Sequence, residues 1–313
     1  MVSLIDYLLA TKGAFRSHLR RLFLCRRLLP DTRFLLFCFT LGASSAAIAD
    51  SPATNPALDT SCHVDSYDQS ATVQYVHDGD TLKLSDGRKV RLIGINTPEL
   101  ARDNRPAEAF AVEATKALKT MIRPGAAVHL RFGRDRKDHY DRLLAHVFSG
   151  DGKNLQAELL KNGYARAIVI PPNTAFSACY LAQERLARCN KAGIWHKNRT
   201  LQAKDIKNGD TGFQLISGTL QNMHINDKGI WLNIDNKLTI GIRPDNIQLF
   251  DVEKITAMLN EQVSVRGWLN VNRHRKKDKN TAFYMRIRHP AALQLSSEYR
   301  CKIGQQSRPS LSD

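Results

Sequence analysis

The chain has 313 residues and a formal net charge of +16. This length is sufficient for two domains, each with a hydrophobic core, and it excludes the class of very small proteins that cannot bury one. The excess of lysine and arginine favours a polyanionic partner, with nucleic acid first and an acidic membrane surface second. The six cysteines form no C-x-x-C pair or Cys/His cluster, so nothing indicates a zinc site.

The N-terminal segment has the composition of an export signal. Seven basic side chains in residues 1–33 precede an apolar run at 34–41, and small residues lead to Ala47-Ile48-Ala49. This order is typical of a signal peptide, so residues 1–49 are predicted to be cleaved off. The uncharged stretch is shorter than the roughly 20 residues of a membrane span, which makes an anchor the less favoured alternative. The remaining chain keeps a charge of +11 and is expected in the periplasm or outside the cell.

Four cysteines remain after this cleavage, an even number that suits an oxidising compartment. Cys179 and Cys189 lie ten residues apart on one predicted helix. That is about 15 Å along its axis, beyond the reach of a disulfide. We predict the pairs Cys62–Cys179 and Cys189–Cys301, and the swapped pairing stays open.

The first half of the chain reads as a strand-rich domain after a polar lead-in, residues 50–71. Alternating apolar residues and turn signals such as Asp86-Gly87 predict five strands: 72–77, 82–85, 90–95, 128–132 and 143–148. A helix with Pro106 near its first turn carries one apolar face: Phe110, Ala114, Leu118 and Met121. Two more helices are predicted at 154–162 and 175–191, which gives a mainly β fold with helices.

The second half has a similar pattern. Residues 198–212 are polar and are predicted as a linker, and residues 298–313 as a tail. Between them, five strands are predicted, with a helix at 252–259 after the third: 215–224, 229–234, 238–242, 263–271 and 282–288. This arrangement predicts a second, OB-like five-stranded barrel over residues 213–297.

Two neighbouring stretches concentrate the polar chemistry. Asp78-Gly79-Asp80-Thr81 puts two carboxylates in a tight turn, and Arg91 and Glu99 follow within about two strands' length. Carboxylates bind hard cations, and guanidinium holds phosphate. Arg91 interrupts an apolar run, where a buried guanidinium is costly without an anion. Each residue alone also fits an ordinary turn or a surface charge, so only the combination indicates a site.

Residues 72–196 resemble the thermonuclease (staphylococcal-nuclease-like) family in order and spacing. The matching pieces are Asp78–Thr81, Arg91 with Thr97-Pro98-Glu99, the loop from Asp138 to Arg142, and Gly193-Ile194-Trp195. The resemblance implies an OB barrel with three helices over residues 72–197. It also implies calcium-dependent hydrolysis of DNA or RNA phosphodiesters, with magnesium as the alternative cation.

The resemblance further implies a set of metal ligands. Asp80 and the backbone carbonyl of Thr97 would bind the cation, and Asp78 would lie behind them. Asn96 stands where the family has a second metal carboxylate. An amide oxygen still binds calcium but brings no charge, so we expect weak binding, at about 10⁻⁴–10⁻³ M.

The other residues carried over by the resemblance act on the substrate. Glu99 would orient or deprotonate the attacking water, and Arg91 and Arg142 would clamp the phosphate. Tyr140, in the same loop as Arg142, is a candidate contact to nucleic acid.

Three further positions depart from the family's pattern. Val169 and Pro171 stand where the family offers tyrosines to the substrate, so stacking by those rings is lost. Asp141 stands where the family has a glycine and is expected to add negative charge beside Arg142.

The second half carries candidates for single-strand binding in place of a catalytic cluster. Its basic run lies between the last two strands: Arg273, Arg275, Lys276, Lys277 and Lys279. Four aromatic residues are available for stacking: Trp231, Trp268, Phe283 and Tyr284. A solvated hairpin tip and core tryptophans explain the same residues equally well.

Taken together, the sequence predicts an exported, metal-dependent nuclease that acts on DNA or RNA. We expect a monomer with no stable membrane association after signal cleavage. The alternative is a two-barrel protein that binds nucleic acid without cutting it. A third interpretation is a protein that binds another anion, such as an envelope polymer.

Overall fold

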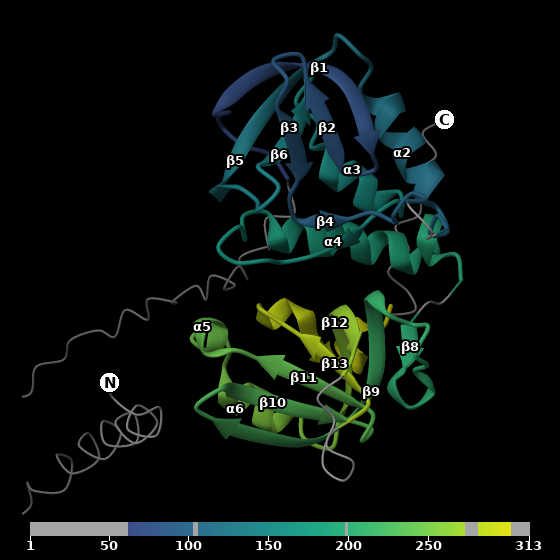
Figure 1. Cartoon of the computed structure of the whole chain (residues 1–313), viewed down its shortest axis with the longest axis vertical. Helices are drawn as coiled ribbons and strands as arrows, with labels where there is room; N and C mark the ends of the chain where they lie inside the picture. The colour runs from purple at the N-terminus through teal and green to yellow at the C-terminus, as the bar shows by residue number, and fades with distance from the viewer. Residues whose placement is uncertain (1–61, 103–105, 198–199, 273–280, 302–313) are drawn as a thin grey trace, which may run out of the picture. The chain divides into compact units, whose positions relative to one another are not determined.

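The computed structural model describes four ranges of the chain (Figure 1): 62–102, 106–197, 200–272 and 281–301. The predicted signal peptide, 1–49, lies outside them, as do Arg273, Arg275, Lys276, Lys277 and Lys279. Within these ranges, no helix combines the length and hydropathy that crossing a membrane requires.

Five strands of the first half close into a barrel: β1 (Gln69–Asp78), β2 (Thr81–Leu84), β3 (Lys89–Leu92), β5 (Ala127–Lys137) and β6 (Leu143–Ser149). Their order is β1-β2-β3-β6-β5, and β5 pairs back with β1. Neighbours run antiparallel except β3 and β6, which are parallel. This is the OB topology, as predicted.

Alternation along the strands explains why the barrel closes. Residues at every second position point inward and exclude water from the interior. Six aliphatic side chains of this interior are fully buried: Leu82, Leu84, Val90, Leu92, Val128 and Leu130. The polar turn between β1 and β2 therefore has a rigid support.

Three helices accompany this barrel: α2 (Ala111–Met121), α3 (Leu155–Lys161) and α4 (Ser177–Cys189). The Asn154 side chain caps α3 by accepting a hydrogen bond from the Ala157 N–H. The prediction that Pro106 lies near the first turn of a helix is wrong. The Glu108 N–H donates to the Glu99 carbonyl, so the chain returns to Glu99 first, and α2 starts after Phe110 in the left-handed conformation.

The run predicted as one strand at 90–95 is divided. β3 ends at Leu92, Gly94 adopts a φ of +85°, and β4 (Ile95–Asn96) leaves the barrel. β4 pairs with β7 (Arg166–Ala167) in a separate two-stranded ladder, with Asn96 opposite Arg166. This exit brings the segment after β4 back over the β1–β2 turn.

The second half forms a closed barrel of the same topology. Its strands are β9 (Gly212–Asn226), β10 (Gly229–Ile234), β11 (Leu238–Ile242), β12 (Gln262–Val271) and β13 (Phe283–Arg286). The order is β9-β10-β11-β13-β12, β12 closes onto β9, and β11 and β13 are parallel. Two short helices follow the third strand: α5 (Pro244–Ile247) and α6 (Val252–Ala257).

The stretch predicted as a linker packs on this barrel. β8 (Thr200–Gln202) pairs with β9, and Ala203 and Ile206 are buried in the core. On the other side, β14 (Leu293–Leu295) pairs with β12 and leads into α7 (Ser296–Tyr299). Short 3₁₀ turns complete the chain: Gly193–Trp195, Ala203–Asp205 and Pro290–Ala292.

The cysteines pair as predicted, and the swapped pairing is excluded. Cys62 is joined to Cys179 with a Cα–Cα distance of 5.7 Å, and Cys189 to Cys301 with 5.5 Å. Cys179 and Cys189 both belong to α4. This helix is therefore cross-linked to both flanks of the described chain.

Candidate active site

Asp80 is a buried carboxylate in the turn between β1 and β2. Its Oδ2 accepts hydrogen bonds from the Thr97 backbone N–H at 3.2 Å and from the Thr97 hydroxyl at 3.0 Å. The same oxygen lies 3.0 Å from Nη2 of Arg91 on β3. One side chain thus ties the turn to β3 and to the segment after β4.

The conformation of the turn depends on Asp78 and Gly79, the two residues before Asp80. A Cβ on Gly79 would lie 2.8 Å from Oγ1 of Thr97 and 3.0 Å from Cβ of Ala114, so only glycine allows this close approach. Oδ1 of Asp78 accepts the N–H of Asp80 at 3.0 Å. Asp78 therefore has the ordinary role of a turn-forming aspartate, and it supports Asp80 from behind.

The charge of Arg91 is met within the protein. Besides Asp80, its Nη2 donates to the Ile95 carbonyl at 3.0 Å and its Nη1 to the Leu92 carbonyl. The side chain is 15% exposed. A guanidinium has five N–H donors, so Arg91 keeps donors for a ligand while its position is fixed.

Glu99 follows Thr97 by two residues and is exposed. Its pKa is raised by partial burial and by the charges of Asp80 and Asp78, against the opposing effect of Arg91. The pKa of Asp80 is raised as well, because burial outweighs the attraction of Arg91. A raised carboxylate pKa suits proton transfer, and of these two carboxylates only Glu99 is exposed to water, so Glu99 is the candidate base.

The donors at this end of the barrel fit a hard cation. Asp80 offers a carboxylate, the buried Asn96 an amide oxygen and Thr97 a backbone carbonyl. A cation beside Asp80 would also offset the cost of burying its charge. In the ranges that the structure describes, no group of three or more His, Cys, Asp and Glu forms a metal cluster. Cation binding would therefore use neutral oxygens together with the carboxylate of Asp80.

Arg142 and Tyr140 are not in contact with this cluster. Arg142 Nε lies 2.8 Å from Oδ2 of Asp138, and its guanidinium lies 5.4 Å from the centre of the Tyr140 ring. Tyr140 is 70% exposed. The register nevertheless brings Arg142 near β3, because Arg91 is opposite Leu144, two residues further along β6.

Two expectations about single side chains need correction. The carboxylate of Asp141 lies 2.6 Å from Nζ of Lys137, so a lysine offsets the negative charge that was expected to act on Arg142. Phe283 is buried in the core of the second barrel and is not available for stacking. Trp268 is 43% exposed and stays a candidate, whereas Trp231 donates from its indole to Asn226.

The sequence predictions missed two groups of arginines. Arg266 on β12 is buried against Glu184 of α4, with Nη1 2.9 Å from the carboxylate. Arg286 and Arg288 line a cavity near Trp268. The alternation of Met285, Arg286, Ile287 and Arg288 was a usable signal for the second group, because it leaves the arginines on the face away from the core.

A closed OB barrel that holds a buried carboxylate, an arginine and a nearby glutamate at one end defines a nuclease-like domain. Residues 89–197 match the family described as staphylococcal nuclease homologue. The chain is 37% identical to Endonuclease YncB of Bacillus subtilis over 134 residues and 34% identical to Thermonuclease of Staphylococcus intermedius over 132 residues. It is 38% identical over 132 residues to the SPbeta prophage-derived endonuclease YokF of Bacillus subtilis.

The chain therefore belongs to the staphylococcal nuclease family. Each alignment includes 41% of the chain. The aligned part of the chain spans 63% of the length of YncB, 44% of YokF and 77% of the staphylococcal thermonuclease. The second barrel lies outside residues 89–197, so its role has to be argued from its own side chains.

Proposed function

We propose that this protein is an exported, metal-dependent nuclease that hydrolyses phosphodiester bonds of DNA or RNA. The observation that carries the proposal is the cluster of Asp80, Arg91 and Thr97 with Glu99 beside it. The high positive charge supports a polyanionic substrate. The two disulfides support an oxidising compartment, and with it export.

Each residue has a role in this reaction. Arg91 and Arg142 hold the phosphate and balance the charge that grows on its oxygens during attack. Glu99 accepts a proton from the attacking water as the water oxygen bonds to phosphorus; the P–O bond on the opposite side breaks, and the leaving oxygen takes a proton from solvent. Asp80, Asn96 and the Thr97 carbonyl would hold a cation, which when bound supplies positive charge to a phosphoryl oxygen.

Cleavage by the purified full chain tests this function. Labelled single- and double-stranded DNA and RNA are incubated with calcium, magnesium or a chelator, and the products are separated on a gel. Cleavage is expected with a metal and none with the chelator. Asn96 places a neutral amide where the family has a metal carboxylate. This difference favours a second candidate function, a protein that binds nucleic acid without cutting it. Binding without cleavage under every metal would establish that alternative.

Asn96→Asp is expected to tighten calcium binding by about tenfold, because it adds one negative charge to the ligands and affinity follows ligand charge. Calorimetric titration of calcium measures the change. Asn222→Asp, at an exposed position of the second barrel, adds the same charge away from the site and serves as the control. Equal affinity of the Asn96→Asp variant and the wild type would show that Asn96 is not a ligand.

A further inference from the structure

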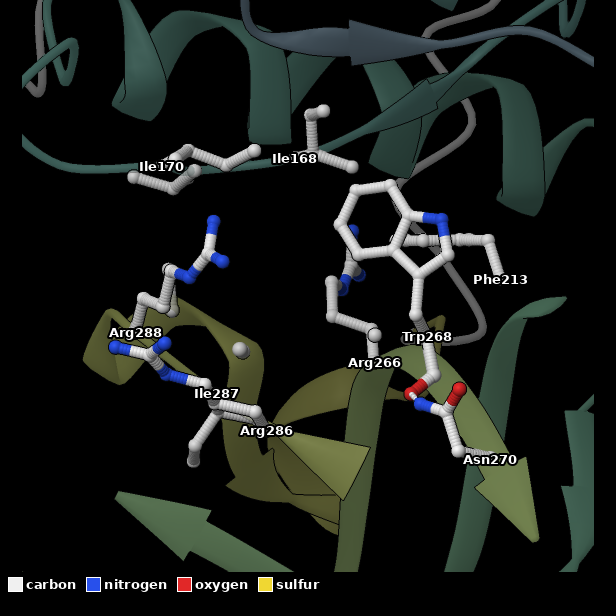
Figure 2. A pocket seen from close by; sticks show the side chains of 13 residues that line it. Ile168, Ile170, Phe213, Arg266, Trp268, Asn270, Arg286, Ile287 and Arg288 are labelled. Carbon is white, nitrogen blue, oxygen red and sulfur yellow. Dashed lines mark hydrogen bonds between the residues drawn. The ribbon is translucent and has the colours of Figure 1, made fainter. Parts of the chain in front are cut away.

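A cavity of about 250 Å³ lies beside the second barrel, and its walls differ in chemistry (Figure 2). One wall is aromatic and carries Trp268 and Phe213, one is aliphatic and carries Ile168 and Ile170, and one end is cationic. The volume is near the small end of the range for ligand pockets, at about 300 Å³. Such a space suits a small planar group with an anionic part.

The aromatic wall is held ready for stacking. Trp268 on β12 is directly opposite Phe213 on β9, and their rings meet edge to face with centroids 5.1 Å apart. The indole is 43% exposed. Figure 2 shows it reaching up into the space below Ile168. A large ring that is fixed from behind and open in front is a good platform for a base.

The cationic end carries more positive charge than the protein neutralises. Asp245 pairs with Arg286, whose Nη2 lies 2.9 Å and 3.2 Å from its two oxygens, while Arg286 Nε is buried without a hydrogen-bond partner. Arg288 has no hydrogen bond or ion pair in the part of the chain that the structure describes. Figure 2 shows its guanidinium pointing toward Ile170. An anion at this end would meet the unpaired guanidinium of Arg288, beside the positive charge of Arg286.

The cavity also borders the support of the candidate active site. Ile168 directly follows β7, and its N–H donates to the Gly94 carbonyl at 3.0 Å. β7 pairs with β4, which carries Asn96. The aliphatic wall therefore continues from the strand that pairs with β4, the strand of the proposed cation ligand.

We propose that this cavity binds one nucleotide of a single-stranded nucleic acid, with the base on Trp268 and the phosphate on Arg288. The inference rests on the proposed nuclease function and adds an accessory site for the substrate strand. A free nucleoside monophosphate presents the same base and phosphate. The strand is favoured because the aliphatic wall leads to the ladder of the active site.

Binding is measured with the full chain carrying Glu99→Gln, in the presence of a chelator, so that the strand stays intact. Anisotropy of a labelled single-stranded oligonucleotide gives the affinity. Trp268→Ala and Arg288→Ala are each expected to weaken binding about tenfold. Lys254→Ala removes one exposed charge from α6 and is expected to keep the affinity of the parent. Circular dichroism and the melting temperature verify that each variant is folded.

Tryptophan fluorescence identifies the residue in contact. The chain has three tryptophans, of which Trp195 is buried and Trp231 is partly buried and hydrogen-bonded. The oligonucleotide is expected to quench the tryptophan fluorescence of the parent protein. Trp268→Phe keeps a stacking ring, so it is expected to bind within a few-fold of the parent and to lose the quenching.

Three outcomes decide the proposal. Unchanged affinity in folded Trp268→Ala and Arg288→Ala would overturn it. Equal quenching by a nucleoside monophosphate and by the strand, at equal concentration, would overturn the assignment to a strand and leave a mononucleotide pocket. If the wild type cleaves nothing but Trp268→Ala still weakens strand binding, the accessory site stands and the nuclease function fails.

Discussion

Glu99→Gln is expected to slow phosphodiester cleavage by about 10²–10⁴-fold. The amide keeps the size of the side chain but cannot accept a proton from water. Single-turnover cleavage of a labelled oligonucleotide at saturating protein measures the loss without interference from binding. Glu108→Gln is the matched control, because Glu108 is an exposed acid close to Glu99 in space. A rate within twofold of wild type in Glu99→Gln would exclude Glu99 as the base.

The same substitution is expected to leave the protein at least as stable as the wild type. The pKa of Glu99 is raised in the folded state, so the folded protein holds this proton to a higher pH than the unfolded chain. Wild-type stability therefore falls as pH rises from the ordinary value of about 4.5 through the raised value, and glutamine removes this loss. Thermal unfolding at pH 4 and pH 7 should show the gain at pH 7 only. A lower melting temperature at both would assign the lost activity to unfolding.

Arg266→Ala is expected to lower the free energy of unfolding by about 3–5 kcal/mol. It removes the closer of the two arginines that pair with Glu184, a buried carboxylate, and leaves Arg188 Nε at 3.5 Å from it. It also removes the donor to the Ala167 carbonyl, 3.2 Å from Arg266 Nη1. Denaturant unfolding followed by circular dichroism measures the loss.

The double variant Glu184→Gln with Arg266→Met separates the charge from the packing. It fills the same space with neutral groups, and such replacements of buried pairs are often neutral or stabilising. We expect it to recover most of the stability lost in Arg266→Ala. A double variant that is as unstable as Arg266→Ala would show that the lost hydrogen bonds of the Arg266 guanidinium, and not the charge of Glu184, dominate the effect.

Local patterns in the sequence predicted both barrels, because the alternation of apolar residues and the position of the turns determine strands one at a time. The same signals failed where the chain makes a tertiary choice. The run from Val90 to Ile95 is apolar throughout, and only its pairing with β7 reveals that it divides at Gly94. The start of α2 likewise depends on a hydrogen bond from Glu108 back to Glu99.

The candidate site shows the same limit to what local sequence patterns predict. The family resemblance named Asp80, Arg91 and Glu99, and the structure brings these elements to one end of the barrel. The ion pair between Arg91 and Asp80 could not be predicted. The sequence indicates that a buried guanidinium needs an anion, but it does not identify which anion neutralises the charge. Glu184 and Arg266 are 82 residues apart. Charge pairs at such separation leave no periodic signal.

The positions of the two disulfides also determine when each of them can form during synthesis. They join residues 117 and 112 positions apart, and both pass through α4. Cys179 finds its partner as soon as the first barrel is made, but Cys189 waits until residue 301 has emerged. A fragment that ends after the first barrel would carry Cys189 as an exposed free thiol, able to couple two copies. Work on the isolated nuclease barrel would therefore need a substitution at Cys189.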